Sequence, residues 1–137
     1  MSVQLPSAVS SLLSFITTDC GLTIKETRTS SSFGDAIISL QGRHLRVRLV
    51  HDKGDWYVEA SSNQKPDIWY DMALLQEQIT NQVGEDVLDL DEQAVVFRAR
   101  WQEIADMLTG PNLNVMHQAL ERRRQDRVKR RFPKWLE

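Results

Sequence analysis

The stretch Arg43–Ala60, RHLRVRLVHDKGDWYVEA, predicts a β-hairpin, and the fold class depends on it. Apolar and polar residues alternate on both sides of the turn at residues 52–55, which is the pattern of half-buried strands. An even-numbered turn of two or four residues would place the apolar residues of both strands on one sheet face. We therefore predict an even turn, with Glu59 opposite Arg46 or Arg48 in a cross-strand ion pair on the other face. The apolar set comprises Leu45, Val47, Leu49, Trp56, Val58 and Ala60.

The segments that flank the hairpin predict an α+β fold. Before it, the sequence predicts a helix over about residues 5–19 and strands near residues 22–28 and 36–40. The chain should therefore form a four-stranded antiparallel β-meander with one N-terminal helix and, after the hairpin, three C-terminal helices. All of these elements are expected to belong to one domain, residues 1–137, because a chain of this length is of ordinary domain size.

Three apolar stripes define the predicted C-terminal helices. The first helix should begin at Pro66 or Asp67, because proline suits a first helical turn, and it should stop at Gly84. Its stripe consists of Ile68, Met72, Leu75 and Ile79. The second helix should have Asp91 as its N-cap and should end at Gly110-Pro111. The third should start near Asn112 or Asn114 and run to about Arg131.

Composition and charge limit the cellular setting and the classes of partner. The single cysteine, Cys20, the absence of a long apolar run and the absence of a basic residue before Lys25 predict a cytoplasmic protein without a membrane anchor. Residues 1–120 contain nine basic and sixteen acidic side chains, whereas residues 121–137 contain eight basic and three acidic ones. An acidic body with a basic tail from about residue 121 can mark a charged partner.

Candidate catalytic and metal-binding residues are few. His44, His51 and His117 have no metal-ligand spacing, and Cys20 has no cationic neighbour in sequence, so we expect no metal, no cofactor and an unreactive thiol. Asp52 and Asp55 flank the hairpin turn, and with His51 they could serve a small enzyme. Asp67 and Asp71 form a second pair, one helical turn apart in the predicted helix. Aspartate is also an ordinary turn and helix-start residue, which is the interpretation we favour for both pairs.

Two aromatic pairs bracket the passage from the hairpin to the predicted helix: Trp56-Tyr57 and Trp69-Tyr70. Trp56 and one residue of the second pair should belong to the core. The remaining rings, with Arg46 and Arg48, would form an exposed surface of a kind enriched at protein interfaces.

The basic tail allows two interpretations. Its clustered arginines between Arg122 and Arg131, with Phe132 and Trp135, could bind phosphates and bases of a nucleic acid. Equally, the tail could dock as a solvated helix end on the acidic segment at residues 85–92. Leu136-Glu137 resembles a vector-derived remnant and carries no argument.

One region resembles a known class of proteins. The segment VRLVHDKGDW, residues 47–56, followed by Trp69-Tyr70-Asp71, resembles small bacterial immunity proteins that accompany polymorphic or contact-dependent toxins. The resemblance covers about residues 43–75. It implies a cytoplasmic non-enzyme that neutralises a toxin by covering its active surface, and an acidic body would suit a basic nuclease toxin.

We therefore predict a non-catalytic protein-binding module whose interface combines two loop regions, because binding residues concentrate on loops of a rigid scaffold. A nucleic-acid-binding accessory protein and a small enzyme are the alternatives. The predicted partner-binding residues are Asp52, Asp55, Tyr57 and Tyr70 near the hairpin, and Glu85, Asp86 and Asp89 between two helices.

Overall fold

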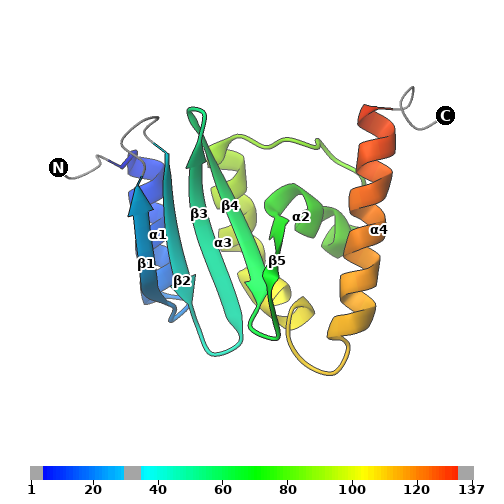
Figure 1. Ribbon diagram of the computed structural model, residues 1–137, viewed down its shortest axis with the longest axis horizontal. Coiled ribbons are helices and arrows are strands. Elements are labelled where there is room, and N and C mark those ends of the chain that lie inside the picture. The colour runs from blue at the N-terminus through cyan, green and yellow to red at the C-terminus, as the bar shows by residue number, and fades with distance from the viewer. Residues whose placement is uncertain (1–4, 30–34, 133–137) are drawn as a thin grey trace.

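The computed structural model describes residues 5–29 and 35–132, which form an antiparallel sheet and four helices (Figure 1). Trp135 and Leu136-Glu137 lie outside the described residues. The elements in chain order are α1 (Ser7–Thr18), β1 (Thr23–Thr29), β2 (Ala36–Gln41), β3 (Leu45–Asp52), β4 (Asp55–Ser62), β5 (Lys65–Asp71), α2 (Met72–Thr80), α3 (Leu90–Met107) and α4 (Leu113–Arg131).

The central hairpin has the predicted even register. Asp52 pairs with Asp55 across a two-residue turn, and both turn residues have positive φ angles, 52° at Lys53 and 89° at Gly54. A turn with two positive φ values matches the right-handed twist of the flanking strands. The predicted ion pair is also present, because Glu59 lies opposite Arg48 and accepts a 2.6 Å bond from its Nε atom.

The sheet has five strands and not the predicted four. The segment from Lys65 to Asp71 forms the edge strand β5, which pairs antiparallel with β4, so the prediction of a helix starting at Pro66 or Asp67 was wrong. Pro66 is tolerated because an edge strand leaves one row of backbone donors unused. The helix α2 begins only at Met72, with Asp71 as its N-cap; the Asp71 carboxylate accepts a 2.8 Å bond from the backbone N–H of Leu74.

The helix after the acidic loop begins two residues earlier than predicted. Its N-cap is Asp89 and not Asp91, because Asp89 and Glu92 form a capping box with the backbone N–H groups of both residues. Glu92 stands three residues after Asp89, which is the spacing that the motif requires, whereas Asp91 lies within the first turn. The last helix starts at Leu113, close to the predicted position.

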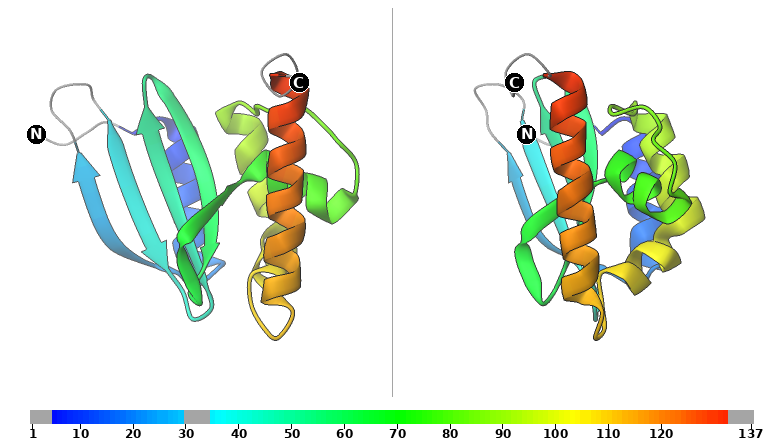
Figure 2. Two further views of the ribbon diagram at one scale, coloured as in Figure 1. Left: turned by 45° about the vertical axis from the view of Figure 1, so that its right-hand side comes forward. Right: turned by 90° about the vertical axis from the view of Figure 1, so that its right-hand side faces the viewer.

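The sheet is covered on one face. Helices α1, α2 and α3 lie together on that side, whereas α4 stands beside the β5 edge (Figure 2). The apolar set of the hairpin faces these helices, and Leu45, Val47, Leu49, Val58 and Ala60 are buried in one hydrophobic cluster. The strand register directs half-buried Arg48, Val50 and Tyr57 to the opposite face. Figure 2 shows no helix packed across that face. No helix within the described ranges is both long and apolar enough to cross a membrane.

Candidate functional site

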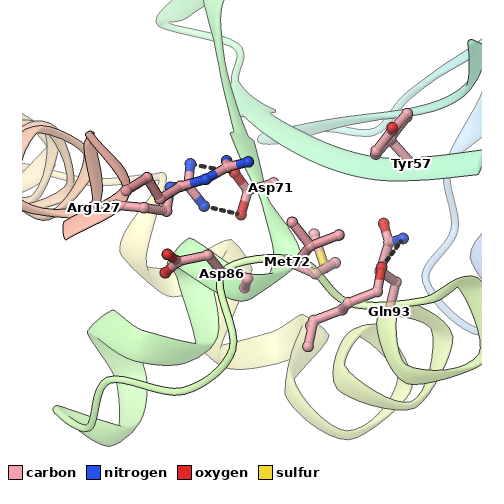
Figure 3. Close-up of a pocket in the computed structure, with 10 residues that line it drawn as sticks. Tyr57, Asp71, Met72, Asp86, Gln93 and Arg127 are labelled. Atoms are coloured by element: carbon pink, nitrogen blue, oxygen red, sulfur yellow. Dashed lines mark hydrogen bonds and ion pairs between the residues drawn. The ribbon is translucent and has the colours of Figure 1, made fainter. Parts of the chain in front are cut away.

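Two adjacent pockets share part of their lining, and we call them together the Tyr57 groove. The first pocket, of about 260 Å³, lies between β4, the loop before α3 and the distal part of α4 (Figure 3). The second, of about 520 Å³, lies between the same loop and the hairpin turn. Tyr57, Val87 and Leu88 line both pockets. The groove thus connects the two sequence regions in which we predicted binding residues.

The groove exists because β5 ends early. The last pairing of β5 with β4 joins Asp71 to Glu59, so the part of β4 that carries Trp56 and Val58 has no neighbouring strand on that side. The side chain of Gln93, from α3, takes the place of that strand. Its Oε1 accepts a 2.7 Å bond from the Val58 N–H, and its Nε2 donates a 3.0 Å bond to the Trp56 carbonyl.

Gln93 also fixes the opposite wall of the groove. Its Nε2 donates a second 3.0 Å bond, to the carbonyl of Leu88 in the loop before α3. One buried amide therefore bonds to both strand β4 and the loop, and Tyr57 projects from β4 on the side away from Gln93 (Figure 3). This residue was missed in the sequence, where an isolated glutamine within a helical stripe carries no signal of such a role.

The rim of the second pocket is acidic. Asp55, Asp89 and Glu92 line it, with Trp56 and Leu90 among its apolar residues and without a basic side chain in the lining. The Asp89 and Glu92 carboxylates each accept one bond within the capping box. Asp89 accepts from the Glu92 N–H at 2.8 Å, and Glu92 accepts from the Asp89 N–H at 3.2 Å. Asp55 lies directly opposite Asp52 in the hairpin, an arrangement of like charges that is unfavourable for a strand pair.

The first pocket is closed at its far end by an ion pair. Arg127, from α4, donates two bonds to the Asp71 carboxylate, of 3.1 and 2.7 Å (Figure 3). These bonds, aided by the charge of Asp71, raise the pKa of the Arg127 guanidinium above its ordinary value. Asp71 therefore caps α2 and anchors α4 at the same time, whereas Asp67 is exposed on β5, so the predicted Asp67–Asp71 pair on one helix does not form.

Four of the seven predicted binding residues line the Tyr57 groove: Asp55, Tyr57, Asp86 and Asp89. Asp52 is exposed beside the groove at the hairpin turn. Glu85 is exposed in the loop and lines a separate pocket against α2. The structure thus brings the hairpin and the acidic loop together, as the prediction of a shared interface requires.

Tyr70 is not available to a partner. Its side chain is only 2% exposed, because the pairing of Tyr70 with Ala60 directs it to the covered face of the sheet. Its hydroxyl is hydrogen-bonded to His117 Nδ1, and the Arg124 guanidinium lies 5.1 Å from the ring centroid. The sequence predicts that one residue of Trp69-Tyr70 is buried, and the structure shows that this residue is Tyr70, so its assignment to the interface is wrong.

The burial of Tyr70 has a measurable consequence. Loss of hydration raises the pKa of its hydroxyl from 10 to about 12, against a smaller lowering by Arg124. The neutral form is therefore favoured in the folded state, and this contribution to stability is present below pH 10 and is lost as the pH rises toward about 12. We expect the free energy of unfolding of the wild type to fall across this interval more than that of Tyr70→Phe, as measured by urea denaturation at several pH values. Equal losses in both proteins would contradict the assignment.

The other aromatic rings behave as the sequence indicated. Trp56 packs against the hydrophobic cluster, and Trp69 lies half-buried on the uncovered sheet face. The guanidinium carbons of Arg46 and Arg48 lie 5.6 and 4.3 Å from the centroid of a Trp69 ring. Cation–π contacts of this kind order both the ring and the arginines.

The residues of the enzymatic alternative lie next to one another at the end of the hairpin. His51 packs its ring against Trp56, with centroids 4.9 Å apart, while Asp52 and Asp55 are exposed at the turn. Within residues 5–29 and 35–132, no three His, Cys, Asp or Glu side chains gather as metal ligands would. Burial, followed by the charge of Asp19, raises the pKa of the Cys20 thiol to about 12, so it is a weak nucleophile at neutral pH.

The basic tail docks on the body along most of its described length. Four arginines of α4 bond to residues of α2, β5 or the acidic loop: Arg123, Arg124, Arg127 and Arg130. The sequence allowed docking on the acidic segment at residues 85–92, but of these four arginines only Arg130 reaches that segment, at Asp86. The signal was present, because Arg123, Arg127 and Arg130 recur at helical spacing and so share a helix face.

The chain was also compared with known proteins. No protein-family model, no curated protein and no solved structure matches it.

Proposed function

We propose that this protein is a non-catalytic, protein-binding module of the immunity type, which acts in the cytoplasm and neutralises a basic toxin domain by covering its active surface. The observation that supports this most directly is the Tyr57 groove. Acidic and aromatic residues from the hairpin and from the loop before α3, about thirty positions apart in the sequence, line two adjacent pockets that share Tyr57, Val87 and Leu88.

The chemistry of the groove suits a protein partner with cationic side chains. Its aromatic and aliphatic lining, with Tyr57 at the centre, provides the apolar area that anchors interfaces, and its acidic rim complements positive charge. The Asp52–Asp55 pair supports the same proposal, because like charges directly opposite each other weaken a hairpin. A basic partner would relieve this repulsion, so the two carboxylates favour binding at a small cost in stability.

The proposal is tested by two kinds of substitution: changes of exposed charges, which should affect the association rate, and truncation of Tyr57, which should affect the dissociation rate. Asp55 and Glu85 are exposed and form no ion pair with a described residue, so their reversal to lysine should leave the fold intact. We expect Asp55→Lys with Glu85→Lys to slow association with the toxin and to reduce its salt dependence, because rim charges mainly steer encounters. Tyr57→Ala should instead speed dissociation about thirtyfold, which corresponds to about 2 kcal/mol for a hot-spot residue.

The natural partner to test is the toxin domain encoded beside this chain in its host. Rates would be measured by surface plasmon resonance, and protection by survival of cells that express the toxin. Asp91→Lys, a reversal of an exposed carboxylate outside the groove lining, is the matched control for the charge changes. The proposal fails if no toxin domain binds the wild type, or if survival beside toxin-producing neighbours is the same with and without the protein.

A further inference from the structure

The distal half of α4 is attached to the body mainly by charged groups. The buried residues of this helix are Leu113 and Leu120, and both precede residue 121. Beyond that point one helix face presents Arg123, Arg127 and Arg130, which we call the arginine clasp. The proximal half of α4 is therefore anchored by apolar burial, whereas the distal half depends on the clasp and on the bond from Arg124 to the Trp69 carbonyl.

The clasp arginines form ion pairs with three carboxylates of the acidic body. Arg127 pairs with Asp71 at 2.7 Å, and Arg130 lies 3.0 Å from Asp86 and 3.4 Å from Glu77. Arg123 reaches the other oxygen of Glu77 at 3.2 Å.

The three arginines differ in their access to solvent. The side chain of Arg127 is 15% exposed and that of Arg130, nearer the helix end, is 36% exposed. Solvent and salt weaken the pairs of the more exposed residue first. Opening of the clasp should therefore begin at the tip, with Arg130, while the apolar anchors keep the helix attached.

The clasp and the Tyr57 groove share residues. Asp71, Asp86 and Arg127 all line the first pocket, so the clasp forms one wall of the groove (Figure 3). Two of the carboxylates that a basic partner would meet there are thus already bound to arginines of the same chain.

We propose that the arginine clasp is an intramolecular competitor of the partner: a basic segment of the toxin that enters the groove displaces it from Asp71 and Asp86, the two carboxylates of the clasp that line the groove. This inference rests on the proposed function for the identity of the partner. The competition itself needs only the described residues and a cationic segment that can replace Arg127 and Arg130.

Hydrogen exchange measured by mass spectrometry on the full chain tests the clasp without a partner. We expect residues 121–131 to exchange faster as salt is raised, while residues 113–120 remain protected. Arg130→Gln should increase exchange in residues 121–131 even at low salt. Arg122 is exposed and makes no described contact, so Arg122→Gln is the matched control and should leave exchange unchanged.

A charge swap separates the clasp from a general loss of helix stability. Arg130→Asp alone should release residues 121–131, and the addition of Asp86→Arg should restore much of their protection, because the pair is re-formed with reversed polarity. The clasp proposal is wrong if neither added salt nor Arg130→Gln changes the exchange of residues 121–131 relative to the wild type and Arg122→Gln. It is also wrong if the charge swap does not restore protection.

Competition is tested with a fluorescent nona-arginine peptide as the probe. If the clasp is closed nine-tenths of the time, Arg127→Gln with Arg130→Gln should bind the peptide about tenfold more tightly than the wild type, because affinity scales with the competent fraction. If the double variant does not fold, Arg130→Gln alone can replace it, and it should give a smaller gain in affinity for the peptide. Equal affinities for wild type, clasp variants and Arg122→Gln would overturn the competition.

The two proposals fail separately. If the peptide results hold but no toxin binds, the clasp stands and the immunity function falls. If the toxin binds wild type and clasp variants with equal affinity, the function stands and the competition is rejected.

Discussion

Val58→Asp is expected to unfold the protein at room temperature. The Val58 side chain is 0% exposed and lies opposite Leu49 at the centre of the hydrophobic cluster. A carboxylate there would have no partner to replace water, at a cost of several kcal/mol against a total stability of roughly 5–15 kcal/mol. Circular dichroism should show loss of the cooperative thermal transition.

Val50→Asp provides the matched control for this substitution. Val50 is also a strand valine of the central hairpin, but it is half-buried on the uncovered face of the sheet. A carboxylate at this position keeps contact with water, so the variant should remain folded with a modestly lower melting temperature. If Val58→Asp melts cooperatively at the wild-type temperature, the assignment of the covered face is wrong.

The hairpin could be predicted because its constraints act over a few residues. Alternation of apolar and polar side chains fixes which residues share a face, and a shift by one residue would expose the whole apolar set. The ion pair between Arg48 and Glu59 followed from the same register. Local pattern and tertiary packing agree in this part of the chain, and the prediction depended only on the local pattern.

The strand β5 could not be predicted in this way because its local pattern is ambiguous. Ile68 stands four residues before Met72, so it extends the apolar stripe of α2 backward and imitates a longer helix. What decides the structure is pairing with β4, a contact that the sequence does not reveal. The orientation of Tyr70 also depends on its place in that pairing.

The candidate site was predicted in its charge and only in part in its geometry. Acidic residues and Tyr57 were chosen from residue type, and the structure places four of the seven predicted residues in the lining of the two pockets. Gln93 and the contacts of the clasp were not predicted, because each depends on a residue more than thirty positions away, such as Val58 for Gln93. The helical spacing of the three arginines indicates that they share a face, but it does not identify the carboxylates that they contact.

Gln93→Leu is the second substitution expected to have a large effect. It would leave the Val58 N–H and the carbonyls of Trp56 and Leu88 without their present partner. Each buried group that loses its bond costs about 1–3 kcal/mol, so the loss of three bonds should cost roughly 3–9 kcal/mol. Urea denaturation would measure it. Gln102→Leu, at an exposed position of the same helix, is the matched control and should change stability by less than about 0.5 kcal/mol.

A glutamate at position 93 separates hydrogen bonding from packing. Gln93→Glu keeps the size of the side chain and an oxygen for the Val58 N–H, but it places a second carboxylate oxygen against two carbonyls. If the amide acts as a substitute strand, Gln93→Glu should be at least as destabilising as Gln93→Leu above pH 6, and hydrogen exchange should rise first at Val58. A stability close to wild type for either variant would mean that water or the backbone replaces the amide. The position of the loop relative to β4 would then not depend on Gln93.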